Sequence, residues 1–319
     1  RNFILAAAFL LSAADLRAQL NVYFVDVAQG DAIYIEFPNG TNALIDGGPS
    51  GERIAKFLND KGVTKIDRMV LTHPHSDHYR GFKKVFADLD VKAFYYTRAE
   101  NRDAIGDNNL RELAAAEPGC TTRYPKPGDI LNWDPQVTVK VFNACWKPVV
   151  MYDNDETNNC SLVMRLYYNG NGVLLTGDAT SDIEAEMLSY FKSGLQSNIL
   201  KVGHHGSHTS TSDAFLARVR PDYAFISAGL GNIYGHPRKE TLDRLRAAGA
   251  KIFLTTAGTQ SLTIPAPAKG GTFPAVPIIN NFNAPPEQKF EEMTLTWTPE
   301  VPVGMNAPAM SQLTDSVAK

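Results

Sequence analysis

His73-Pro74-His75-Ser76-Asp77-His78 is a dense group of potential metal ligands, and it follows directly on an apolar run. It places three imidazoles and one carboxylate within six positions. Neutral imidazole is the commonest metal ligand in proteins, and a set of nitrogen and oxygen ligands without thiolates suits zinc, with manganese or iron as alternatives. The competing interpretation is a solvated polar loop.

The other histidines favour the metal interpretation. The chain has seven, at 73, 75, 78, 204, 205, 208 and 236, and all of them fall in three short stretches. Histidines with unrelated structural roles would be scattered along the chain. We therefore expect these three stretches to meet at one metal site.

Composition limits the class of protein. With 319 residues, 44% hydrophobic and 20% charged, the chain has a globular profile. Its formal charge of −3 counts against tight nonspecific binding of nucleic acid by the whole surface, although a local basic patch is compatible with it. Basic residues near the motifs either form such a positive rim or lie on solvated helix faces: Arg80, Lys83, Lys84, Lys201, Arg238 and Lys239.

The first 18 residues predict a signal peptide. Residues 3–14 form an apolar segment after Arg1, and Leu16-Arg17-Ala18 suggests cleavage after Ala18. A membrane anchor is the alternative, but about 20 apolar residues are needed for a span. We expect a mature protein that is secreted or periplasmic. Two of its three cysteines, Cys120, Cys145 and Cys160, can pair in an oxidising compartment, and the pairing is open.

Hydrophobic periodicity and turn residues predict alternating strands and helices, hence an α/β fold. We expect a β-meander at 20–27, 32–37 and 42–45, a hairpin at 161–168 and 173–175, and an irregular segment at 117–135. Further strands are expected at 66–72, 93–97, 137–142, 199–202, 223–227, 251–255 and 290–297, and helices at 52–59, 81–88, 109–116, 182–191, 213–219 and 238–248. The domain is expected to span 19–298, followed by a loose tail at 299–319.

Four candidate ligands come just after predicted strands or the glycine turns that follow them. They are His73, Asp178, His204 and His236. If the strands run in parallel, these side chains emerge at one sheet edge, where α/β proteins place their sites.

The number of candidate ligands is sufficient for two metals. The set is His73, His75, Asp77, His78, Asp178, His204 and His236. Asp178 would bridge two divalent ions, Zn²⁺ or alternatively Mn²⁺, and a metal-bound hydroxide would attack the substrate. We expect Asp77, Asp178 and His205 to take part in catalysis. A single structural zinc is the alternative, although such sites favour closed cysteine and histidine sets.

Asp31 and Asp46 have two interpretations. They either orient the metal ligands or are ordinary turn aspartates.

The ordered motifs carry a family resemblance. His-x-His-x-Asp-His at 73–78, Leu-Thr-Gly-Asp at 175–178 and a later histidine resemble the metallo-β-lactamase superfamily, which implies a four-layer αβ/βα sandwich. More narrowly, the chain resembles the ComEC-type hydrolase domain of bacterial DNA-internalisation proteins over about residues 20–262. The segments that carry this narrower resemblance are 25–32, 44–48, 159–163, 200–207 and 234–237.

The resemblance implies a division of the ligands. One metal would be held by His73, His75, His204 and Asp178, and the other by Asp77, His78, Asp178 and His236, with His205 able to exchange roles with His204. The chain has no histidine between 78 and 204, where β-lactamases and thiolester hydrolases of the superfamily place one, which argues against those activities.

Two departures limit the transfer from the competence domain. It has a carboxylate where this chain has His75, and the full competence proteins carry a multi-span membrane channel that this sequence lacks.

For the substrate, we expect a phosphodiester, with DNA as the leading candidate. Ser207 and Thr209 precede a predicted helix whose N-terminus offers N–H groups to phosphate, and Asn159 and Ser161 are further donors. Ser212 is alternatively only a helix cap. Two other function classes stay open: hydrolysis of a small phosphoester, such as a choline phosphodiester, or of a lactam or lactone, and a non-enzymatic metal-binding module.

Overall fold

The computed structural model describes residues 19–101, 105–267 and 277–281. The expected signal peptide at 1–18, the expected strand at 290–297 and the expected tail at 299–319 lie outside the described residues. Among the helices within those described ranges, none combines the length and apolarity that crossing a bilayer requires.

The first sheet has eight strands in the order β19-β18-β1-β2-β3-β5-β7-β9. Its first three strands along the chain form the expected antiparallel meander, and β3, β5, β7 and β9 run parallel. The strands are β1 (Leu20–Phe24), β2 (Ile33–Glu36), β3 (Asn42–Ile45), β5 (Arg68–Leu71), β7 (Ala93–Tyr96), β9 (Thr121–Arg123), β18 (Gln260–Ile264) and β19 (Ile278–Asn281).

The second sheet has seven strands in the order β10-β11-β13-β14-β15-β16-β17. Its half from β14 to β17 is parallel. The strands are β10 (Ile130–Leu131), β11 (Thr138–Asn143), β13 (Val163–Tyr168), β14 (Asn171–Leu175), β15 (Ile199–Lys201), β16 (Tyr223–Ile226) and β17 (Lys251–Leu254). Two small parallel pairs join β4 (Lys65–Ile66) to β6 (Asp90–Val91), and β8 (Ala99–Asn101) to β12 (Val149–Met151).

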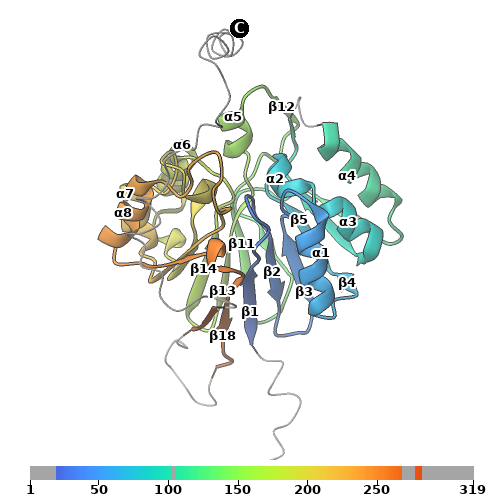
Figure 1. The fold of residues 1–319 in the computed structure, drawn as a ribbon, viewed down its shortest axis with the longest axis horizontal. Helices are drawn as coiled ribbons and strands as arrows, with labels where there is room; N and C mark the ends of the chain where they lie inside the picture. The colour runs from blue at the N-terminus through green and yellow to red at the C-terminus, as the bar shows by residue number, and fades with distance from the viewer. Residues whose placement is uncertain (1–18, 102–104, 268–276, 282–319) are drawn as a thin grey trace, which may run out of the picture. The chain divides into compact units, whose positions relative to one another are not determined.

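Helices cover the outer face of each sheet (Figure 1). On the first sheet these are α1 (Gly51–Asp60), α3 (Phe82–Asp88) and α4 (Ile105–Ala116), and on the second they are α6 (Ser181–Phe191), α7 (Asp213–Val219) and α8 (Lys239–Ala247). The layer order is helices, sheet, sheet, helices. This confirms the expected αβ/βα sandwich.

The main core lies between the two sheets. Alternate residues of β1 divide between two clusters: Val22 and Phe24 face the second sheet, whereas Tyr23 belongs to the cluster shared with α1 and α3. Phe24 stacks on Phe225 of β16 with ring centroids 4.2 Å apart. Burial of each such ring contributes about 1.5–3 kcal/mol, so the alternation in the sequence fixes which faces of the two sheets meet.

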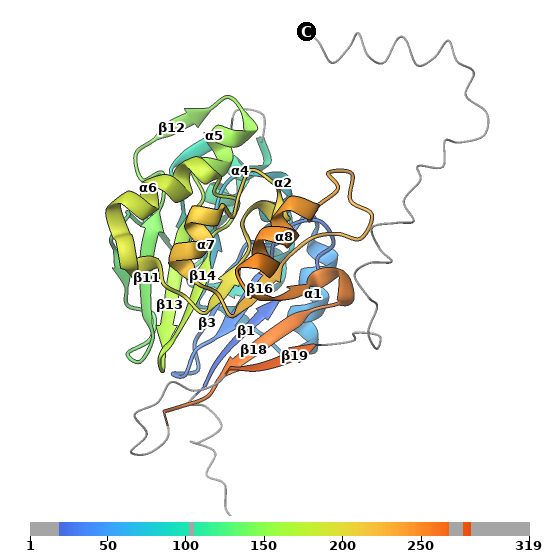
Figure 2. The same cartoon turned by 90° about the vertical axis from the view of Figure 1, so that its left-hand side faces the viewer.

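Some elements are absent from the sequence expectations. The strands β18 and β19, drawn in orange in Figure 2, extend the first sheet beyond β1. The segment 117–135, expected to be irregular, contains β9 and β10. The short helix α5 (Asn154–Asn159) was also not expected. It matters for function, because it forms one wall of the pocket described below.

Candidate metal centre

The loop after β5 carries the histidine and aspartate motif at residues 73–78. His73 is fully buried at the end of this strand, and His78 is fully buried on the short helix α2 (Ser76–Tyr79). Asp46, at the end of β3, fixes the loop, because its carboxylate accepts hydrogen bonds from Thr72 N at 2.8 Å and Thr72 Oγ1 at 2.7 Å. Parallel pairing of β3 and β5 brings the two strand ends together.

Asp178 is the centre of the cluster. It follows β14, and its Oδ2 lies 3.2 Å from His205 Nε2, 3.3 Å from His78 Nε2 and 3.8 Å from His73 Nε2. Four groups of close ligand atoms occur in this region, and two of them contain residues of the 73–78 motif without Asp31 or Asp46: one is His73, His75 and Asp178, and the other is Asp77, His78 and His205. Asp178 reaches both groups, as expected of a carboxylate that bridges two ions.

The ligands come from the strand ends of both sheets. The motif at 73–78 follows β5 of the first sheet, whereas Asp178 and the histidine pair follow β14 and β15 of the second. The expectation that all ligands emerge at the edge of a single sheet is therefore wrong. The site lies where the ends of strands from two facing sheets meet.

Carboxylate and carbonyl oxygens contact the Nδ1 atoms of two imidazoles, on the side of each ring away from Asp178. His78 Nδ1 lies 2.8 Å from Asp46 Oδ2, and His205 Nδ1 lies 3.0 Å from Ser227 O and 3.4 Å from Asp31 Oδ1. With the proton on Nδ1, the Nε2 atoms of both rings are left to face Asp178. Such partners fix the tautomer and orientation of metal-binding histidines, so Asp46 and Asp31 have orienting positions.

The turn that carries the histidine pair has unusual backbone geometry. His204 and His205 both lie in the left-handed region, with φ of 48° and 53°. Non-glycine residues rarely adopt this conformation, and such strain concentrates at functional sites. The turn sends the two adjacent side chains to different depths: His205 is buried with the second ligand group, and His204 is partly exposed.

The structure places the remaining predicted ligands farther out. His204 Nε2 is 4.0 Å from Asp178 Oδ2, while its Nδ1 lies 3.2 Å from Thr209 Oγ1. The His236 ring lies 5.5 Å from that of His204 and 6.4 Å from that of His205. His205, expected in catalysis, thus has a ligand position beside Asp77 and His78, and His236 lies outside both close groups. The roles of His204 and His236 stay predictions.

Burial and charge act in opposite directions on these groups. Burial disfavours the charged form of His78, but Asp178, Asp46 and Asp77 outweigh it and hold its pKa well above the usual value. Burial would raise the pKa of Asp178, but His205 and His78 hold it well below the usual range. Burial, reinforced by His205 and His204, lowers the pKa of His236 to about 4. At neutral pH Asp178 is thus anionic and the His236 ring is neutral.

The side chains fit a pair of divalent ions. Two ligand nitrogens, His78 Nε2 and His205 Nε2, face each other at 3.3 Å. Tetrahedral ligands about 2.0–2.1 Å from one zinc lie roughly 3.4 Å apart. Asp178 Oδ1 and His75 Nε2 are buried without a hydrogen-bond partner among the described residues. Converging donors with unsatisfied atoms are what a bound cation would neutralise.

A buried ion pair behind the cluster was not expected. Lys201 is fully buried on β15, and its Nζ lies 2.7 Å from Asp31 Oδ2. A place for Lys201 in a positive rim on the surface, expected from its position near the motifs, is therefore wrong, because the side chain is buried. Two other members of that rim, Lys84 and Lys239, pair with acidic residues one helical turn away.

The four residues expected to bind substrate all make hydrogen bonds within the protein. Ser161 Oγ accepts from Asp178 N at 2.9 Å, and Asn159 Oδ1 accepts from Thr180 Oγ1 at 2.5 Å. Ser207 Oγ and Thr209 Oγ1 lie 3.0 Å apart. Their contact with substrate stays a prediction, and none of the four lines the pocket.

The amides ahead of the α7 helix are also occupied. Ser212 caps this helix, and the buried Glu184 accepts from Thr211 N and Ser212 N. These N–H groups are therefore not free for phosphate.

A pocket of about 570 Å³ opens over the cluster. Its floor contains His75, Asp77, Asp178, His204 and His205. One wall is α5, with Asp155 and the buried Asn158, and the other is the loop between β16 and α8, with Tyr234 and Arg238. The sequence does contain a signal for the helix α5, because Asp153 followed three residues later by Glu156 is a pattern typical of a helix start. In the structure, Asp153 Oδ1 accepts a hydrogen bond from Glu156 N at 2.7 Å.

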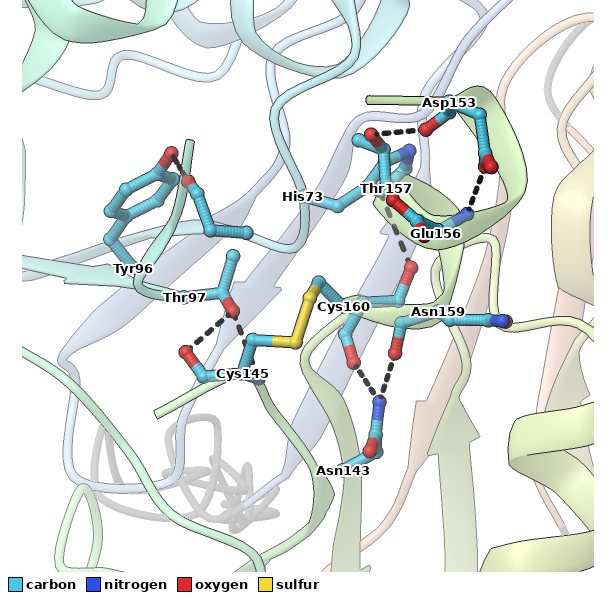
Figure 3. Close-up of a disulfide and its surroundings, with 12 residues drawn as sticks. His73, Tyr96, Thr97, Asn143, Cys145, Asp153, Glu156, Thr157, Asn159 and Cys160 are labelled. Atoms are coloured by element: carbon cyan, nitrogen blue, oxygen red, sulfur yellow. Dashed lines mark hydrogen bonds between the residues drawn. A yellow bond between two sulfur atoms is a disulfide. The ribbon is translucent and has the colours of Figure 1, made fainter. Parts of the chain in front are cut away.

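A disulfide anchors the α5 wall (Figure 3). Cys145 pairs with Cys160, the residue directly after α5, and Cys120 is free. Asn143 Nδ2 donates to Asn159 O at 2.8 Å and to Ser161 O at 2.9 Å, so a side chain from β11 holds the same corner. The wall is thereby tied to Ser161, which itself supports Asp178.

Comparison with known proteins agrees with this geometry. Residues 25–229 match the metallo-beta-lactamase superfamily. The chain is 29% identical over 259 residues to ComE operon protein 3 of Bacillus subtilis, covering 75% of this chain and 32% of that protein. It is 30% identical over 237 residues to competence protein ComA of Neisseria gonorrhoeae, covering 72% and 30%. It thus spans about a third of the length of these curated relatives.

The expected likeness to ComEC-type competence proteins is confirmed by these relatives. Among solved structures, a mutant of the CmlA beta-hydroxylase aligns with a TM-score of 0.50 at 12% identity, over 76% of this chain and 53% of that one. This likeness concerns the fold alone. By its fold, its ordered motifs and the match over most of its length, the chain belongs to the metallo-β-lactamase superfamily.

Proposed function

We propose that the chain is an exported phosphodiesterase with two divalent metal ions, Zn²⁺ or alternatively Mn²⁺, and nucleic acid as its substrate. The observation that carries the proposal is the position of Asp178, whose single carboxylate reaches both ligand groups. A structural zinc would need only one closed group of ligands. The names of the relatives, which are competence proteins, support a nucleic acid substrate.

The ligand positions assign a task to each group of residues. His73, His75 and Asp178 would hold one ion, and Asp77, His78, His205 and Asp178 the other. A bound pair supplies Lewis acidity and a water whose pKa is lowered toward neutrality. Asp46 Oδ2 and Ser227 O lie against Nδ1 of His78 and His205, so that Nε2 of each ring faces Asp178 and would bind an ion there. The burial of His73 and His78 keeps bulk water from the rear of the site.

Export is supported by the disulfide and by the predicted signal peptide. Disulfides persist in oxidising compartments and are rare in the cytosol, and Cys145–Cys160 lies close beside the site. We therefore propose a secreted or periplasmic location.

The first test is hydrolysis by the purified protein of bis-p-nitrophenyl phosphate and of single-stranded DNA, with added Zn²⁺ or Mn²⁺. Asp178→Ala serves as the inactive control. Activity on both substrates that disappears in the variant supports the proposal. Two bound metals without activity on either substrate would refute it and return lactams and lactones to consideration.

A second candidate is a small cationic phosphodiester such as a choline ester. Asp155 and Tyr234 line the pocket, and Tyr234 is 53% exposed. A carboxylate together with an aromatic ring suits a quaternary ammonium group. Hydrolysis of p-nitrophenyl phosphorylcholine at a higher kcat/KM than thymidine 5′-p-nitrophenyl phosphate would favour this candidate.

A further inference from the structure

The loop between β16 and α8 exposes large apolar side chains at the mouth of a polar pocket. Ile233 is 92% exposed and Tyr234 is 53% exposed, and both line the pocket. Exposed apolar residues gathered at a polar site mark a surface that contacts a ligand. The Tyr234 ring lies nearly parallel to the His236 ring, with centroids 5.7 Å apart. One face of the Tyr234 ring therefore lies toward His236, and the residue remains more than half exposed to a ligand.

Hydrogen bonds hold this loop in one conformation. The Asn232 side chain donates to Gly229 O at 2.9 Å and to His236 O at 2.5 Å, and its Oδ1 accepts from His236 N at 3.0 Å. Arg238 N donates to Gly206 O at 2.9 Å, in the turn of the histidine pair. The loop that carries Tyr234 is thus positioned before a ligand arrives, which lowers the entropic cost of binding.

The same loop brings hydrogen-bond donors for a phosphate. Among the described residues that line the pocket, Arg238 is the only arginine or lysine, and its guanidinium has no ion pair there. Gln29 also lines the pocket: its Oε1 accepts from Gly229 N at 3.0 Å, and its Nε2 is buried without a hydrogen-bond partner. A buried donor left unpaired requires a partner that the protein itself does not supply.

We propose that Gln29, Tyr234 and Arg238 form a nucleotide subsite, in which Gln29 and Arg238 bind the phosphate oxygens and Tyr234 stacks on the base. This rests on the proposed phosphodiesterase function and adds which part of the substrate the enzyme recognises. Guanidinium and amide donors suit phosphate, and aromatic rings accept any base. The proposal predicts a preference for nucleoside esters without a preference for sequence.

Two esters with the same leaving group test the subsite: thymidine 5′-p-nitrophenyl phosphate and methyl p-nitrophenyl phosphate. The wild type should have the higher kcat/KM for the thymidine ester. Tyr234→Ala should lower that value by about 5- to 100-fold, the range expected for base stacking, and leave the methyl ester within twofold. Arg238→Gln should weaken both. Tyr190→Ala, another exposed tyrosine, 78% exposed on α6, is the matched control and should change neither.

Binding of the products distinguishes this subsite from the proposed reaction. Thymidine 5′-monophosphate and methyl phosphate are titrated calorimetrically into the zinc-loaded protein. If the wild type binds thymidine 5′-monophosphate more tightly than methyl phosphate, and Tyr234→Ala loses this difference, the subsite is supported. This holds even if neither ester is hydrolysed, because the lack of hydrolysis would count only against the proposed reaction. Equal effects of Tyr234→Ala on both esters and both products would overturn the subsite while leaving the reaction intact.

Discussion

The Lys201–Asp31 pair behind the metal centre provides a sharp test of the structure. Both side chains are almost fully buried, and the ammonium and carboxylate are 2.7 Å apart. Lys201→Met removes the cation, keeps much of the side-chain volume and leaves the buried Asp31 carboxylate without its closest cationic partner. Removing one partner of a buried pair costs about 3–5 kcal/mol. We expect the free energy of unfolding to fall by about that amount.

The assay is urea unfolding of the metal-free protein in EDTA, followed by circular dichroism. The double variant Asp31→Asn/Lys201→Met is the control, because it leaves no buried charge and should lose less stability than Lys201→Met alone. If Lys201→Met costs under about 1 kcal/mol, or if the double variant is the less stable of the two, the ion pair does not have the role that its burial implies.

The same pair predicts a dependence on pH. Burial raises the pKa of Asp31, but Lys201 and His205 outweigh it and hold the pKa below the usual value. In the wild type, this contribution to stability is therefore present above the unfolded pKa of about 3.9 and is lost as the pH falls. Without Lys201, burial makes the folded protein bind the proton more tightly. The stability deficit of Lys201→Met should then grow between pH 5 and pH 8, and a constant deficit would contradict this reasoning.

Three further predictions concern the metals and the disulfide. Asp178→Ala should lose both ions, measured by mass spectrometry of the dialysed protein, whereas His236→Ala should keep at least one; retention of both ions by Asp178→Ala would exclude a bridging role. Asp46→Asn should weaken metal binding by about 10- to 100-fold, as for other partners of ligating histidines. Competition with a zinc-binding dye measures this affinity, and an unchanged affinity would contradict an orienting role for Asp46. Cys145→Ser/Cys160→Ser opens a loop of 15 residues and should lower the free energy of unfolding by about 3 kcal/mol, measured by urea unfolding, whereas Cys120→Ser should change it little.

Most of the parallel core could be predicted from the sequence because its signals are local. The strand at Asn42–Ile45 and the helix at Asp213–Val219 were predicted at the residues observed. The strand β18 was missed because its formation depends on a distant partner: Leu20 pairs with Ile264, at the opposite end of the domain. No periodicity within Gln260–Ile264 reveals a contact of that kind, and the proline-rich segment after it favoured a loop.

The candidate site shows the same division between what is local and what depends on the fold. The identity of the donor atoms is local, and the motif at 73–78 with Asp178 provides them. Which basic residues reach the substrate depends on the fold. Lys201 lies three residues before His204 and Arg238 two residues after His236, yet Lys201 is buried against Asp31 and Arg238 lines the pocket. Sequence distance to a motif therefore says little about access to the pocket.

The choice between His204 and His205 depends on two backbone angles. In an extended strand, adjacent side chains point to opposite faces, so one of the two would leave the site. The left-handed conformation of both residues keeps both rings near Asp178, at 4.0 Å and 3.2 Å from its Oδ2. Glycines at 203 and 206 flank the pair, and a side chain at 206 would meet Pro237 at 2.6 Å. The shape of the turn therefore brings both rings to the site, and it depends on the close packing of Gly206 against Pro237, the residue after His236.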